Sequence, residues 1–275
     1  MKVNKPVRMI LDSWVISIMG LVIALFWMKP QTAEIVKSLM PVRFSLNWFV
    51  GCYVVYYLIH PLLNSAIEKM SPNIMKKFVL VLFVIYSIMG LVGQAYYYTN
   101  LVGFICIHYF VTYYKKYVTL EKKHSRDVKI IAVSVVAIAI WILAINGVSR
   151  YTGKLSNMNL FGGTFMNPLI ILIGFATLNI AVTSAPRYSK IINHVTKFSL
   201  LIYLFHANYF WLTYGKYEWL LMLKNKGMPL FAAVCFTILC YVVATPLLSL
   251  AYTKIFDRLL NVLSEKICCL INCDI

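Results

Sequence analysis

The sequence predicts an all-α membrane protein, a polytopic bundle of about eight transmembrane helices with both termini in the cytoplasm. Of the 275 residues, 61% are hydrophobic and only 13% are charged. Soluble globular domains are near half apolar and a quarter charged, so this composition excludes an ordinary soluble domain. Short segments rich in Lys and Arg separate the apolar runs, and residues 1–275 are predicted to form a single transmembrane domain.

The apolar runs define the spans in chain order. A helix crosses a bilayer with about 17 to 25 apolar residues, and most of the runs reach that length. Pro61 is expected to end the second span, and Asn167-Pro168 to begin the sixth as a cap and a first-turn proline. The outer segments Met28–Ser45 and Gly147–Asn167 are expected to be loops that roof a cavity. The predicted spans are Ile10–Trp27, Leu46–Leu63, Phe78–Gln94, Leu101–Tyr114, Ile130–Asn146, Pro168–Ser184, Val195–Tyr214 and Pro229–Tyr252.

The basic residues set the predicted orientation. With the N-terminus inside, eighteen of the 26 Lys and Arg residues fall in cytoplasmic segments and eight in outer segments. This bias supports cytoplasmic termini. The formal net charge of +17 favours contact with anionic lipid over nucleic acid, because the basic residues lie between spans and form no soluble basic face. The basic run Lys115–Lys129 is interpreted as a topology determinant, with lipid headgroup contact as the weaker alternative.

Ionisable groups are sparse within the predicted spans. Among the nine acidic residues only Asp12 lies near a span interior, beside Arg8, so the sequence shows no transmembrane carboxylate pair of the kind expected for proton-coupled transport. No histidine has metal-ligand spacing, and no metal site is predicted. His108, in the fourth span, is interpreted as a packed and satisfied core histidine. The seven cysteines imply no disulfide framework.

A polar stripe lies on the apolar run Phe198–Asn208 and its continuation. At helical spacing its members share one face, and they are Ser199, Tyr203, His206, Tyr209 and Thr213. His206 falls near the middle of the predicted span, where an ionisable group usually faces a protein interior or a water-filled cavity. Two interpretations stay open for it: a residue lining a functional cavity, or a histidine that only hydrogen-bonds a neighbouring helix.

Three runs of residues follow one another along the chain: W-F-V-G-C-Y-V-V-Y-Y-L-I-H-P-L-L-N at Trp48–Asn64, N-P-L-I-I-L-I-G-F-A-T-L at Asn167–Leu178 and F-S-L-L-I-Y-L-F-H at Phe198–His206. Each run is mostly aliphatic. In their order and spacing they resemble signatures of the acyltransferase-3 family, membrane proteins that acylate cell-surface sugars. The resemblance extends over nearly the whole chain, from Lys5 to Tyr252.

The chain departs from that family at its start. Family members resemble a ten-helix bundle whose first helix carries an arginine and a histidine central to transfer. This chain matches from the family's third span, with Lys5–Arg8 at the basic turn before it, so the first two spans have no counterpart here. Either two further spans lie upstream of a misassigned start, or the chain is a shortened homologue.

The resemblance implies an O-acyltransferase that moves an acyl group, first of all acetyl, from cytoplasmic acyl-CoA to hydroxyls of a cell-surface or exported glycan. Acyl-CoA is then a co-substrate, and no bound cofactor is expected. The implied partners are membrane lipid, a glycan or lipid-linked glycan acceptor, and a complete acyltransferase, with no nucleic acid. The candidate site residues are His206 and Tyr203 in an accessory catalytic role, Ser199, Tyr209 and Thr213 along the channel, and Arg8 and Lys197 at the CoA phosphates. For the two basic residues, a role in setting the topology is the favoured alternative.

Two other functions stay open. The missing N-terminal histidine favours a catalytically inactive relative that binds a glycan or serves as a partner subunit. A transporter of a polysaccharide precursor is compatible with eight spans and a polar-lined helix. However, the sequence shows neither pseudo-symmetric halves nor a pair of broken helices, as many transporters do, and this function ranks last.

Overall fold

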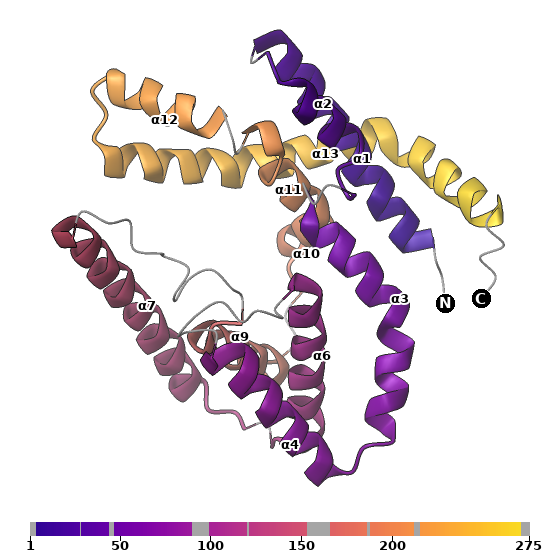
Figure 1. The fold of residues 1–275 in the computed structure, drawn as a ribbon, viewed down its shortest axis with the longest axis vertical. Helices are drawn as coiled ribbons and strands as arrows, with labels where there is room; N and C mark the ends of the chain where they lie inside the picture. The colour runs from indigo at the N-terminus through magenta and orange to yellow at the C-terminus, as the bar shows by residue number, and fades with distance from the viewer. Residues whose placement is uncertain are drawn as a thin grey trace. The chain divides into compact units, whose positions relative to one another are not determined.

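The computed structural model describes residues 4–27, 29–43, 47–89, 99–119, 121–152, 166–185, 188–211 and 215–270. Every regular element within these residues is a helix (Figure 1). The chain divides into two compact units, Met1–Val54 with Tyr188–Ile275, and Val55–Arg187. The division falls inside helix α3 (Trp48–Glu68), which therefore contributes to both units.

The first unit is built on the contact between α1 (Asn4–Trp27) and α13 (Leu230–Leu270), the indigo and the orange-to-yellow helices of Figure 1. Helix α11 (Ser199–His206) packs against both. The side chains buried among them are Ile16, Val50, Leu201, Leu204, Tyr252 and Leu260. The shorter helices of the unit are α2 (Thr32–Leu39), α10 (Lys190–Thr196) and α12 (Lys216–Asn225).

The second unit contains the rest of α3 and two packed helix pairs. Helix α4 (Pro72–Phe83), continued by the π-helical turn η1 (Val84–Ile88), packs on α6 (Asn100–Tyr117). Helices α7 (His124–Thr152) and α9 (Pro168–Thr183) make the most extensive helix contact in the described residues. The buried apolar side chains of this unit include Ile67, Met75, Cys106, Tyr109, Phe110 and Met166.

Among the described residues, four helices are long and apolar enough to cross a membrane, and they are Asn4–Trp27, Trp48–Glu68, His124–Thr152 and Phe231–Leu270. Helix α9 is apolar but shorter, at 16 residues. Only 6% of the apolar 18-residue stretch of α7 is buried, whereas a helix on a soluble protein buries its apolar face. These exposed apolar surfaces suggest contact with lipid and a membrane protein. The structure therefore supports a helical membrane protein, and four of its described helices meet the criteria for a span, against the eight spans predicted.

The predicted start of α9 is confirmed. The Asn167 side chain accepts a hydrogen bond from the Leu169 backbone N–H at 2.9 Å, and Pro168 occupies the first helical turn. A side-chain cap satisfies an N–H that has no partner within the helix, and proline at that position loses no helical hydrogen bond.

The predicted helix end at Pro61 is wrong. Helix α3 continues through Pro61 to Glu68. Proline removes one backbone donor, but the residues after it still pack, because Leu63 and Ile67 contact the cluster that contains Met75 and Tyr109. Packing at the end of the helix thus outweighs the lost hydrogen bond.

The predicted span Val195–Tyr214 is not one helix. Helix α10 ends at Thr196, α11 begins at Ser199, and α11 ends at His206. The chain turns at Asn208, whose side-chain amide donates to the Ile16 carbonyl at 3.3 Å. Gly20 makes room for it, because a Cβ there would lie 2.3 Å from the Asn208 nitrogen. A long-range hydrogen bond from Asn208 therefore accompanies the break in an apolar run that predicts a continuous helix.

Helical segments also lie outside the predicted spans, and α2, α12 and the end of α13 are among them. The expected loop Met28–Ser45 contains α2, whose start is stabilised by a 2.8 Å hydrogen bond from the Gln31 backbone N–H to the Glu34 carboxylate. Helix α13 continues past the expected end at Tyr252 to Leu270. The extension is held because Phe256 and Leu260 still reach the core of the first unit.

Candidate functional site

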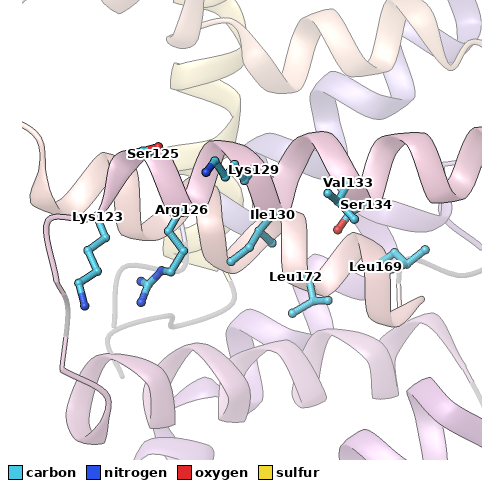
Figure 2. Close-up of a pocket in the computed structure, with 9 residues that line it drawn as sticks. All are labelled: Lys123, Ser125, Arg126, Lys129, Ile130, Val133, Ser134, Leu169 and Leu172. Carbon is cyan, nitrogen blue, oxygen red and sulfur yellow. The ribbon is translucent and has the colours of Figure 1, made fainter.

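A cavity with a basic rim and apolar walls lies between α7 and α9 in the second unit (Figure 2). Its volume is about 710 Å³. The basic side chains belong to the beginning of α7 and the segment before it, and the apolar ones to α7 and α9. The lining residues are Lys123, Ser125, Arg126, Lys129, Ile130, Val133, Ser134, Leu169 and Leu172. Such a lining matches a molecule with an anionic head and an apolar chain.

The basic rim follows from helical spacing. Arg126 and Lys129 are three residues apart in the first turns of α7, so they lie on neighbouring faces, and Lys123 precedes the helix directly. Figure 2 shows Lys123 and Arg126 extending to the same side of the chain. Further along the helix, Ile130 and Val133 continue the lining as apolar side chains. The basic residues at the start of α7 thus form the rim of the cavity, and the apolar residues further along the helix form its wall.

A buried polar contact holds the two helices in register beneath this rim. The Asn179 side-chain amide, on α9, donates to the Asp127 carboxylate on α7 at 2.6 Å and to the Glu121 carbonyl at 2.9 Å. Asp127 and Asn179 are 2% and 1% exposed. Nearby, His124 Nε2 lies 3.0 Å from the Thr183 hydroxyl. Buried polar groups need such partners, so these bonds fix the start of α7 against the end of α9.

Acidic neighbours offset part of the positive charge at the rim. Lys123 pairs with Glu121 at 2.6 Å, and Arg126 contacts the Asp127 carboxylate at 3.3 Å. The hydrogen bond and the charge of Lys123 lower the pKa of Glu121 below its usual value. The rim carries three basic side chains, and two carboxylates pair with Lys123 and Arg126, so the rim keeps a net positive charge.

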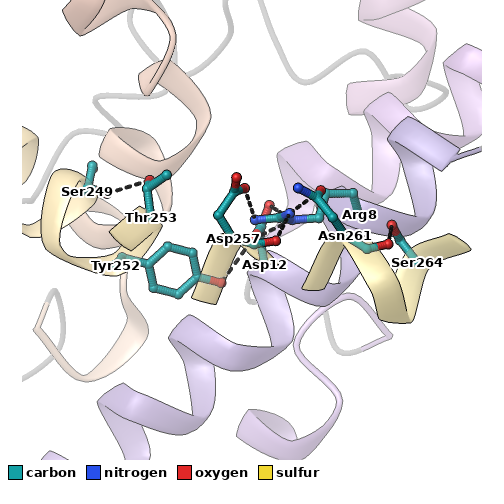
Figure 3. A network of polar contacts seen from close by, with 8 residues as sticks. All are labelled: Arg8, Asp12, Ser249, Tyr252, Thr253, Asp257, Asn261 and Ser264. Atoms are coloured by element: carbon teal, nitrogen blue, oxygen red, sulfur yellow. Dashed lines mark hydrogen bonds and ion pairs between the residues drawn. The ribbon is translucent and has the colours of Figure 1, made fainter. Parts of the chain in front are cut away.

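A second polar network joins α1 to α13 in the first unit (Figure 3). The Arg8 guanidinium pairs with Asp12 at 3.1 Å and with Asp257 at 3.0 Å, and it also donates to the Asn261 side chain. The Tyr252 hydroxyl donates to Asp12 at 2.9 Å. Asp12 is 5% exposed and receives both donors, so this network satisfies a carboxylate buried inside an apolar helix.

The sequence predicted two of the five members of this network. It placed Asp12 beside Arg8, as the i, i+4 ion pair confirms. It missed Asp257 and Asn261, because they lie about 250 residues away along the chain and beyond the predicted end of the last span. Their i, i+4 spacing was the available signal, since it gives one polar face on a continued helix. Arg8, predicted at the CoA phosphates, has its guanidinium between two carboxylates.

The predicted polar stripe is divided by the end of α11. Ser199 is exposed at the first position of that helix, and Lys197 is exposed in the turn before it. The Tyr203 ring lies 5.1 Å from the Phe49 ring. The exposed His206 ends α11, with its ring 5.1 Å from the Tyr241 ring.

The remaining stripe residues lie beyond this helix end. The Tyr209 hydroxyl donates to the Glu34 carboxylate of α2 at 3.2 Å. Thr213 lies outside the described residues. One continuous polar face running from Ser199 to Thr213 is therefore not formed, because Asn208 interrupts the helix.

No protein-family model, curated protein or solved structure matches this chain. Within the ranges that the structure describes, no group of three or more His, Cys, Asp and Glu side chains is arranged to hold a metal ion. The acyltransferase-3 resemblance remains a prediction from the sequence.

Proposed function

We propose that this protein is a membrane O-acyltransferase that takes an acyl group from acyl-CoA and transfers it to a hydroxyl of a cell-surface or exported glycan. The observation that carries the proposal is the cavity between α7 and α9. Acyl-CoA is a thioester with a strongly anionic phosphate portion and an apolar acyl chain, and the cavity offers basic side chains next to apolar walls. The three sequence signatures support the same function.

The proposal assigns the donor phosphates to Lys123, Arg126 and Lys129. Arg126 presents a planar guanidinium suited to two phosphate oxygens, and Lys129 a compact charge. Arg8, the earlier candidate, already pairs with Asp12 and Asp257. The apolar walls would then receive the acyl chain and exclude water from the thioester.

Topology completes the proposal. The predicted topology, with eight spans and cytoplasmic termini, would put the beginning of α7 at the inner face, where acyl-CoA is present. The acceptor hydroxyl attacks the thioester carbonyl, and this step needs a general base and donors for the oxyanion. The sequence suggests His206 and Tyr203 for a part in this step, and both residues belong to the first unit.

Replacing Lys129 with glutamine is expected to weaken acetyl-CoA binding by about tenfold, the usual loss for one charge-assisted contact. The measurement is equilibrium binding of radiolabelled acetyl-CoA to the purified protein in detergent. Lys122→Gln is the matched control, because Lys122 is exposed in the same segment, has the same charge and does not line the cavity.

Competition separates the ligands that share this chemistry. Unlabelled CoA is expected to displace the label, whereas vesicles of phosphatidylglycerol are expected to leave it bound. Displacement by the vesicles alone would identify a lipid headgroup site instead. Equal binding by the Lys129→Gln and Lys122→Gln variants would refute the assignment of the donor to this cavity.

A further inference from the structure

Two histidines meet in the second unit, one from α3 and one from α6. The rings of His60 and His108 lie 5.1 Å apart, at 73° to each other. The Tyr56 hydroxyl is 2.9 Å from His108 Nδ1. The Asn64 amide nitrogen is 3.3 Å from His60 Nε2. Tyr56, His60 and Asn64 recur every four residues, so they share one face of an apolar helix, and Tyr56 and His60 contact His108 from it.

The other ring nitrogen of His108 is unsatisfied. His108 Nε2 is buried and has no hydrogen-bond partner among the residues that the structure describes. The prediction of a satisfied core histidine is therefore wrong for this atom, because the sequence does not show which partners α3 supplies. A buried polar atom without a partner is costly, and such atoms recur at sites that bind a ligand.

The geometry indicates which ligand suits this nitrogen. If His108 Nδ1–H donates to Tyr56, Nε2 carries a lone pair; if Tyr56 donates to Nδ1, Nε2 carries the hydrogen. A hydroxyl group both donates and accepts, so it satisfies Nε2 in either tautomer. A hydroxyl is also the acceptor group of the proposed reaction.

Resting on the proposed function, we infer that His108 is the general base that takes the proton from the acceptor hydroxyl. The hydroxyl oxygen attacks the thioester carbonyl carbon, a C–O bond forms, and its proton moves to His108 Nε2. The C–S bond breaks, and His108 returns the proton to the CoA sulfur. Tyr56 holds Nδ1, as a third group orients the base in other acyl transfer sites.

His60 and Asn64 are assigned as positioning residues. The His60 ring packs against His108 on one side, and the Tyr56 ring against both histidines. Phe104, one turn before His108 on α6, contacts the Tyr56 ring at 5.9 Å. These ring contacts restrict the orientation of His108, and its Nε2 has no hydrogen-bond partner among the described residues.

The test compares His108→Gln, His206→Gln and His194→Gln in the full chain. His194 is the control, because its side chain is exposed on α10. The readouts are acetyl-CoA binding and the rate of acetyl transfer to glycan in membranes. His108→Gln is expected to bind acetyl-CoA like the wild type and to lose transfer by about 100-fold or more. Added imidazole is expected to restore part of its transfer, and His194→Gln to match the wild type.

Each other outcome has a defined meaning. Transfer by His108→Gln close to the wild-type rate, with loss in His206→Gln, overturns this inference and leaves the proposed function intact. A wild-type protein that binds no acetyl-CoA and transfers nothing overturns both. If His108→Gln fails to fold, carbethoxylation of the wild type replaces it: loss of transfer should follow modification of His108, and loss that follows His206 instead overturns the inference.

Discussion

Replacing Arg8 with methionine is expected to lower the free energy of unfolding by about 3 kcal/mol, the size seen when one partner of a buried ion pair is removed. Asp12, buried in an apolar helix, receives hydrogen bonds from Arg8 and from the Tyr252 hydroxyl. The change removes Arg8 and leaves the Tyr252 hydroxyl as its donor. The measurement is unfolding of the purified protein in mixed detergent micelles by added SDS, followed by tryptophan fluorescence.

Asp257→Asn is the matched control for this prediction. The Asp257 side chain is 51% exposed, and an exposed ion pair contributes about 1 kcal/mol or less. Its replacement removes the outer partner of Arg8 and keeps the buried one. Unfolding of Arg8→Met at the same SDS concentration as the wild type would contradict the view that this network holds α1 against α13.

Replacing Asp127 with alanine is expected to cost about 2 kcal/mol and to abolish tight acetyl-CoA binding. The change removes one of the two acceptors of the buried Asn179 amide and the carboxylate that pairs with Arg126, so the contact between α7 and α9 is weakened. The basic rim of the cavity would then move away from the apolar wall. SDS unfolding and acetyl-CoA binding measure the two effects.

Asp127→Asn separates geometry from charge. Its amide oxygen still accepts from Asn179, so we expect most of the stability to remain, together with measurable binding. Should Asp127→Ala bind acetyl-CoA as tightly as Asp127→Asn, the contact between α7 and α9 would have no part in forming the site.

Local signals in the sequence predicted much of the secondary structure. Apolar runs give α1, α3, α7 and α9, and the cap at Asn167 gives the start of α9, because these features depend on residues close together in the chain. The break at Asn208 depends on Ile16 and Gly20, which are almost 200 residues away. The spacing of apolar residues within one segment does not reveal a partner so far away in the sequence.

The candidate sites show the same limit. The run Lys115–Lys129 is visible as a cluster of charge, but its role as the rim of a cavity needs Leu169 and Leu172 from another helix. His108 looks like a core residue until Tyr56 and His60 are beside it. Polar residues within apolar helices are visible in the sequence, whereas the pairs they form depend on tertiary packing.

The most direct test of the central claim is the O-acetyl content of surface glycan, measured by proton NMR on polysaccharide purified from cells that encode this protein. Deleting the gene is expected to remove one set of O-acetyl signals. The wild-type gene and Lys122→Gln should restore them, and Lys129→Gln should restore them incompletely. Unchanged O-acetyl signals in the deletion strain would contradict the proposal that this protein acylates a glycan.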